Sequence, residues 1–181
     1  MLNYREKYQK EVIPAFKKEF GIKNDLAVPK ITKVVVNCGI GKMLIQSSNP
    51  KEIQNRIEES LKMITGQKPK LTRARESISS FKLRAGAPVG FVVTLRGKMM
   101  EGFIDKFIHV VLPRSHDFWG ISLDHFDKKG NLNYGLKEHT VFPEASEDIK
   151  PFGLEITFVT NAKNREQAIK LFKLLGFPLK D

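Results

Sequence analysis

The stretch ITKVVVN, residues 31–37, is dominated by β-branched side chains and predicts a short β-strand. The next five residues, CGIGK at 38–42, contain two glycines, which indicate that the chain leaves the strand there. A glycine-rich turn after a strand is also where many proteins bind the phosphates of a nucleotide. The residues around this turn therefore decide between a nucleotide-binding loop and an ordinary turn.

The nucleotide-binding motifs do not fit this turn. A Walker-type loop needs a glycine five residues before its Gly-Lys pair and a serine or threonine after it, but Val36 and Met43 occupy those positions. The dinucleotide motif needs a third glycine where this chain has Leu44. These mismatches argue against a nucleotide-dependent enzyme.

The best-marked helix follows, over residues 49–66. Asn49 is a suitable N-cap, Pro50 suits the first helical position, and Glu52 completes a capping box. Gly66 is a typical residue for the end of the helix. Loss of the cap is expected to cost about 1 kcal/mol. The buried stripe of this helix is predicted to consist of Ile53, Ile57, Leu61 and Ile64.

Further helices and strands are predicted before the strand at residues 31–37 and after the helix at residues 49–66. The helices are expected at residues 2–20, 99–111 (with Pro113 following its end) and 164–176, and the strands at residues 68–73, 91–96, 133–139 and 154–160. This order favours an α+β fold with a single mostly antiparallel sheet, helices packed on one face and a long basic loop. The whole chain, residues 1–181, is interpreted as one domain.

The composition supports a globular protein of a reducing compartment. Hydrophobic residues make up 41% of the chain, including 13 phenylalanines, which is enough for a core. Cys38 is the only cysteine, so an internal disulfide is excluded, and we expect a buried thiol. No run approaches the roughly 18 apolar residues of a membrane span, and the first 20 residues do not resemble a secretory leader. A cytoplasmic protein without a membrane partner is expected.

Charge is distributed in two blocks of opposite sign. The chain has 31 basic and 20 acidic residues, a formal net charge of +11. Residues 67–98 hold eight basic side chains and one acid, whereas residues 138–155 hold five acids and one lysine. Two such blocks indicate two different partners, one of them a polyanion.

The basic block has the composition of an RNA-binding segment. Arginine and lysine donate to phosphates, hydroxyl groups bond to phosphate or ribose, and glycine lets a backbone approach closely. All three kinds occur between residues 65 and 90, where a long segment, residues 73–87, joins two predicted strands. A solvated charged surface is the alternative interpretation of such a run.

No catalytic or metal-binding constellation is recognised. The histidines are His109, His116, His125 and His139, and none of them has a second ligand at metal spacing. Asp117, Asp124 and Asp127 are expected to be solvated turn residues. The sequence therefore predicts a protein without enzymatic activity, metal or cofactor.

Several motifs, taken in order, carry a resemblance to a known family. They are V-P-x-I at 28–31, TGQKP at 65–69, TRAR at 72–75, S-x-x-x-F-K-x-R at 77–84, VTLRG at 93–97, L-P-R-x-x-D-F at 112–118, F-D-x-x-G-N at 126–131, FPE at 142–144 and GFP at 176–178. The chain resembles the bacterial members of the ribosomal protein L5 family from end to end.

The resemblance implies a structural protein of the large ribosomal subunit. Its partners would be 5S rRNA in the central protuberance, 23S rRNA, neighbouring large-subunit proteins, P-site tRNA and the small-subunit head protein of the S13 family. An organellar ribosome is not excluded by the sequence. A free-standing RNA-binding regulatory protein remains the alternative, which would have no need of the acidic block.

The resemblance also assigns residues. The 5S rRNA surface would comprise Asn37, Gly39, Gly41, Gln67, Lys68, Thr72, Thr94 and Arg96. The tRNA-contacting loop would comprise Arg73, Arg75, Ser77, Ser79, Ser80, Phe81, Lys82 and Arg84, with Phe81 either stacking on a base or anchoring the loop. The bridge to the small subunit would involve Arg114, Glu144, Glu147 and Asp148.

The sequence departs from the family pattern in one region. Ser115, His116 and Trp119 stand where the family usually carries arginines, which puts an RNA or bridge role there in doubt. Trp119 is expected to be buried against Phe118, although an exposed indole that stacks on a base or fills a protein pocket is the alternative.

Overall fold

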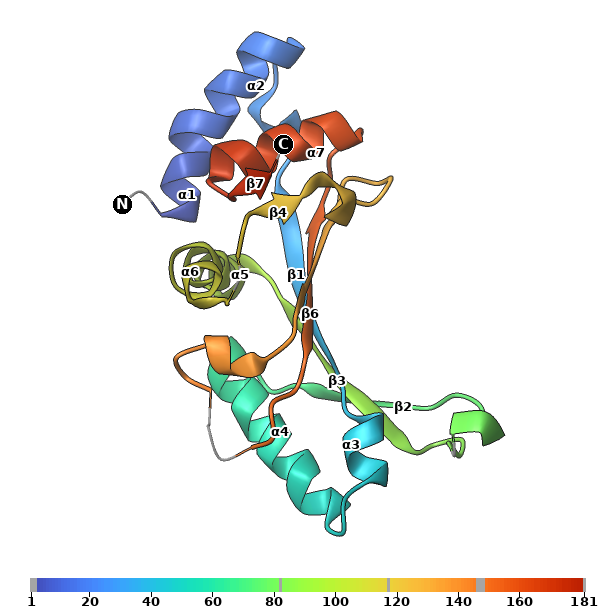
Figure 1. The fold of residues 1–181 in the computed structure, drawn as a ribbon. Coiled ribbons are helices and arrows are strands. Elements are labelled where there is room, and N and C mark those ends of the chain that lie inside the picture. Colours follow the sequence, from blue (N-terminus) through green and yellow to red (C-terminus); the bar gives the residue numbers. More distant parts are fainter. Residues whose placement is uncertain (1–2, 82, 117, 146–148, 181) are drawn as a thin grey trace. The chain divides into compact units, whose positions relative to one another are not determined.

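The computed structural model describes residues 3–81, 83–116, 118–145 and 149–180 and confirms the predicted α+β class (Figure 1). A mostly antiparallel five-stranded sheet has the order β2-β3-β1-β6-β5, and a second sheet pairs β4 with β7 in parallel. The strands are β1 (Ile31–Gly39), β2 (Lys70–Arg73), β3 (Pro88–Leu95), β4 (Ile121–Ser122), β5 (Leu132–Leu136), β6 (Leu154–Thr160) and β7 (Leu179–Lys180). Within the described residues, no helix is both long and apolar enough to span a membrane.

The chain divides into two compact units. Unit 1 consists of Met1–Val34, Arg96–Tyr134 and Thr157–Asp181, and unit 2 consists of Val35–Leu95 and Gly135–Ile156. The boundaries between the units fall inside strands, because β1, β5 and β6 each contribute residues to both. The interpretation of residues 1–181 as one domain stays a prediction.

Unit 1 contains three helical runs. The first joins α1 (Tyr4–Lys7), a π-helical turn η1 (Tyr8–Val12) and α2 (Ile13–Phe20); the second joins α5 (Gly97–Lys106), a π-helical turn η4 (Phe107–Val111) and α6 (Leu112–Arg114); the third is α7 (Arg165–Leu175). The 3₁₀ turns η2 (Asp25–Ala27) and η5 (Leu123–His125) also lie in this unit. Left-handed glycines, Gly21 and Gly176, end the first and third runs, as the sequence predicts.

Two prolines lie inside helical runs rather than after them. The helix expected to stop before Pro113 continues to Arg114, and Pro14 is likewise within α2. Proline lacks an N–H group, and its ring clashes with the carbonyl one turn back. Each π-helical turn ends two residues before a proline, and its wider spacing accommodates the missing hydrogen bond.

The core of unit 1 is a cluster of aromatic rings. Phe107 packs against Tyr134, Phe158 and Phe177 with centroid separations of 5.7, 5.1 and 6.3 Å. Phe172 extends the cluster to Phe177 at 4.8 Å, in an edge-to-face arrangement. Such pairs add about 0.5–1.5 kcal/mol each beyond the area that they bury.

Unit 2 contains α3 (Gly41–Ile45), α4 (Pro50–Thr65) and the 3₁₀ turns η3 (Ser79–Phe81) and η6 (His139–Val141). Gly66 ends α4 with a φ of 68°, as predicted. The predicted capping box is wrong, because the Asn49 side chain makes no cap hydrogen bond and Glu52 pairs with Arg56 at 2.7 Å. Ile57, Leu61 and Ile64 are buried as predicted, whereas Ile53 is only half-buried.

The described residues of the segment that joins β2 to β3 form a hairpin arm rather than an open loop. Ala74 and Ala87 continue the pairing beyond the strands, with Ala74 N–H donating to Ala87 O at 2.9 Å. Ile78 and Leu83 exchange two further backbone hydrogen bonds near the tip. The arm therefore presents its side chains from a defined backbone, and in Figure 1 it extends away from α4.

Candidate nucleic-acid interface

The strand register of unit 2 collects polar side chains on one face of the sheet. Lys70 lies opposite Val92, and Thr72 lies opposite Gly90, so these four residues share a face. Thr94 falls on the same face by the alternation of β3. Phe91, Val93 and Leu95 are buried on the other face. We call the first face, with the residues that β1 adds to it, the open face.

β1 contributes Asn37 and Gly39 to the open face. Both are exposed, whereas Val36 and Cys38, which alternate with them along β1, are buried. The Asn37 side chain donates a 3.4 Å hydrogen bond to the Glu155 carboxylate of β6. Glu155 therefore fixes Asn37 and is an acid that the sequence analysis did not place at this surface.

A close approach of β1 and β3 depends on Gly90. A Cβ atom at this position would lie 2.5 Å from the backbone oxygen of Cys38 and 3.1 Å from the Thr72 hydroxyl. The adjacent residue, Val89, accepts a 3.0 Å hydrogen bond from Ile40 N–H. Gly90 thus permits the close approach of β1 and β3, a role that the sequence analysis missed.

The remaining predicted 5S rRNA residues flank β1, β2 and β3 in the sequence. The Gln67 carboxamide donates to the Thr94 carbonyl at 3.4 Å, which brings it to β3. The Lys68 ammonium lies 3.6 Å from Glu58 and is 79% exposed. Gly41 begins α3. Arg96 directly follows β3 but caps α5 and is grouped with unit 1.

The arm carries the residues predicted to contact tRNA. Arg75, Ser79, Ser80 and Arg84 are exposed. Arg73 and Ser77 also hold the arm together, since the Arg73 guanidinium donates to Gly86 O and the Ser77 hydroxyl accepts from Ala85 N–H, both at 2.9 Å. Lys82 and the side chain of Phe81 lie outside the described residues.

The predicted bridge residues are not brought together by either unit alone. Arg114 is exposed at the end of α6 in unit 1, and Glu144 is exposed in unit 2. Glu147 and Asp148 lie outside the described residues. The bridge assignment therefore stays a prediction.

The expected burial of Trp119 is wrong. Its side chain is 82% exposed. Phe118 packs instead edge-on against Tyr134, with the centroids 6.5 Å apart, so the indole is left in solvent.

The described part of the chain offers neither a reactive thiol nor a metal-binding cluster. Burial raises the pKa of the Cys38 thiol to about 12, which keeps it protonated. Within the described residues, no cluster of three or more His, Cys, Asp or Glu side chains could hold a metal ion. Asp117, expected to be a solvated turn residue, lies outside that part of the chain.

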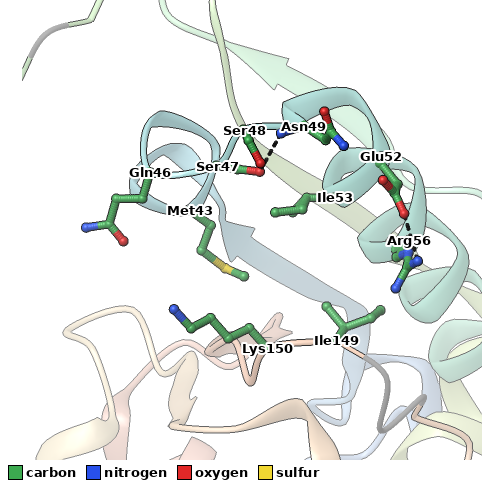
Figure 2. A pocket seen from close by; sticks show the side chains of 10 residues that line it. All are labelled: Met43, Gln46, Ser47, Ser48, Asn49, Glu52, Ile53, Arg56, Ile149 and Lys150. Atoms are coloured by element: carbon green, nitrogen blue, oxygen red, sulfur yellow. Dashed lines mark hydrogen bonds and ion pairs between the residues drawn. The ribbon is translucent and has the colours of Figure 1, made fainter.

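Unit 2 also has an open cavity of about 420 Å³ beside the start of α4, which we call the Ser47 cavity (Figure 2). Met43, Ile53 and Ile149 give it apolar walls, and the Glu52–Arg56 ion pair lies on its rim. The Ser47 hydroxyl accepts a 3.0 Å hydrogen bond from Asn49 N–H. Lys150 also lines the cavity, so its lining holds two cations and one acid and is weakly positive.

Comparisons with known proteins agree with the motifs. Residues 24–84 match the family model described as "Ribosomal protein L5", and residues 88–179 match the model for the C-terminus of the same ribosomal family. "Large ribosomal subunit protein uL5" of Chloroflexus aurantiacus is 49% identical over 98% of this chain and 97% of its own length. The protein of the same name from Carboxydothermus hydrogenoformans is 46% identical over 98% of this chain and 98% of its own length. The one from Dictyoglomus turgidum is 49% identical over 97% of this chain and 97% of its own length.

Proposed function

Because this chain belongs to the ribosomal protein L5 family, and is therefore a non-enzymatic constituent of the large ribosomal subunit, we propose that its open face binds 5S rRNA. The observation that carries the proposal is the collection of Asn37, Thr72 and Thr94 on one face of a sheet. Binding to rRNA is general to this family of ribonucleoproteins.

The chemistry of the open face supports this proposal. Hydroxyl and carboxamide groups on fixed strands can bond to riboses and phosphates of a folded RNA. Gly39 has no atom within 4 Å of where its Cβ would lie, so an RNA backbone can approach β1 there. Lys70 adds a cation on the same face.

A titration of the purified protein tests the proposal. At about 150 mM salt with magnesium, we expect 5S rRNA to bind at least ~10³-fold more tightly than a shuffled RNA of equal length. The double variant Thr72→Val/Thr94→Val keeps the strand shape but removes both hydroxyls, and should lose most of this preference. Thr32→Val, an exposed threonine of β1 in unit 1, is the matched control. Equal binding of both RNAs by the unmodified protein would overturn the proposal.

The arm supports a proposed contact with P-site tRNA. Its exposed residues Arg75 and Arg84 and the serines at its tip stand on a paired backbone, so they are positioned to meet a phosphate chain. The acidic block of unit 2, with Glu144 in its described part, supports a proposed contact with a basic small-subunit protein of the S13 family.

A further inference from the structure

A second cavity of unit 2, of about 570 Å³, lies between α3, α4 and the arm, and extends from the root of the arm at Arg73 and Pro88 to Leu83. Its apolar walls are Leu44, Ile45, Pro50, Leu83, Ala87 and Pro88. Ile45 is 53% exposed, an unusual exposure for an isoleucine in a wall of this kind. We call this space the arm-root cavity.

The polar groups of the arm-root cavity are two carboxamides and two cations. Gln54 and Asn55 come from α4, Lys51 lies one turn earlier, and Arg73 comes from the end of β2. Among the described residues that line it, none is acidic. The Ser47 cavity differs, since its lining includes the acid Glu52, which pairs with Arg56.

We propose that the arm-root cavity receives a single unstacked nucleotide of ribosomal RNA, with the base between the apolar walls and the phosphate beside Lys51 and Arg73. The proposal rests on the proposed function as an RNA-binding surface and extends it to a base-specific contact. RNA loops and bulges present such bases, which proteins hold by their faces and by hydrogen bonds to their edges.

The shape and chemistry of the cavity fit this ligand better than an apolar protein side chain. The Gln54 and Asn55 carboxamides each offer a donor pair and an acceptor, as a base edge requires. A purely apolar ligand would leave these groups without partners. The lining is also positive, which suits a nucleotide and disfavours a basic peptide.

The cavity is continuous with residues already implicated in RNA contact. Gly41, predicted for the 5S rRNA surface, and Arg73, predicted for the arm, both line it. The Arg73 guanidinium donates a 2.9 Å hydrogen bond to Gly86 O, which fixes this arginine in the lining. A nucleotide bound here would connect the open face with the arm.

The test is chemical probing of base edges in complexes of the full-length protein. Reagents specific for the Watson–Crick edges of each base would be applied to 5S rRNA and to 23S rRNA, free and bound, with the shuffled RNA as the third arm. We expect one unpaired base to be protected in one of the two ribosomal RNAs and none in the shuffled RNA. The RNA that shows the protection identifies the source of the nucleotide.

Two variants assign that protection to the cavity. Gln54→Leu removes the carboxamide at constant charge and should expose the protected base and weaken binding of that RNA by about tenfold. Gln46→Leu, the same change in the Ser47 cavity, should preserve both. If the unmodified protein binds 5S rRNA specifically but the two variants give identical probing patterns, the cavity proposal is overturned while the proposed function stands. Absence of specific binding by the unmodified protein overturns both.

Discussion

The core of unit 1 and the core of unit 2 consist of different kinds of side chain. Unit 1 packs a continuous aromatic cluster, in which Phe158 contacts three other phenylalanine rings. Unit 2 packs mainly aliphatic residues of α4, β1 and β3, such as Ile57, Val36 and Leu95. The large rings bury more area per residue, whereas the slim strand residues let β1 and β3 approach closely at Gly90.

The difference separates stability from binding. Seven of the eight predicted 5S rRNA residues and the whole arm belong to unit 2, whereas Arg96 and Arg114 belong to unit 1. Both charge blocks also fall largely in unit 2. We infer that changes to the core of unit 1 affect folding, and that small changes in unit 2 affect RNA contact.

The largest expected effect is the loss of the unit 1 aromatic cluster. Phe158→Ala removes a fully buried ring and should destabilise the protein by about 3–5 kcal/mol in urea unfolding monitored by circular dichroism. At low temperature, the fraction that remains folded should bind 5S rRNA with unchanged affinity. A loss below about 1.5 kcal/mol would show that the cluster does not dominate unit 1. Phe20→Ala, a half-buried ring on α2, is the control and should cost less.

Two glycines on the adjacent strands β1 and β3 give the next largest effect. Gly90→Ala places a methyl group 2.5 Å from the Cys38 carbonyl and should cost about 1–3 kcal/mol because β1 and β3 must separate. Gly39→Ala meets no atom within 4 Å, so its unfolding free energy should change by less than about 1 kcal/mol. If Gly39→Ala nevertheless weakens 5S rRNA binding, the RNA approaches β1 closely. Equal stability of the two variants would refute the role given to Gly90.

The arm gives a smaller effect that stability measurements do not detect. Arg75→Ala/Arg84→Ala removes two exposed cations and should weaken the binding of P-site tRNA to ribosomes. The log–log salt slope should fall by about 0.7–0.9 for each phosphate that the variant no longer neutralises. Filter binding of tRNA to ribosomes carrying the variant measures this slope, and Lys18→Ala/Lys23→Ala in unit 1 is the control. An equal weakening of 5S rRNA binding would show that the arm and the open face are not separate sites.

The sequence predicted those features that depend on local rules. Gly21, Gly66 and Gly176 end their helices in the left-handed conformation, because few other residues adopt it at low cost. The alternation in residues 154–160 became β6. The family resemblance placed residues on strands whose register then brought Thr72 and Thr94 to one face.

The features that failed depend on tertiary contacts. Asn49 has the composition of a cap, but its side chain makes no cap hydrogen bond, and Arg56 takes Glu52 away from the capping box. The paired arm looked like a loop, since the bridge between Ile78 and Leu83 leaves little pattern in the sequence. The arm-root cavity combines α3, α4, β2, the arm and β3, so no local pattern could predict it.

The smallest expected effect is spectroscopic and concerns Trp119, the single tryptophan of the chain. Because its side chain is 82% exposed, its emission should shift little on unfolding, and acrylamide should quench it almost as fast as in the unfolded state. Saturating 5S rRNA should leave the emission unchanged, since Trp119 belongs neither to the open face nor to the arm. Stoichiometric quenching by 5S rRNA would indicate stacking of a base on the indole. RNA contact would then extend to the loop before β4, and the separation of stability from binding between the two units would fail.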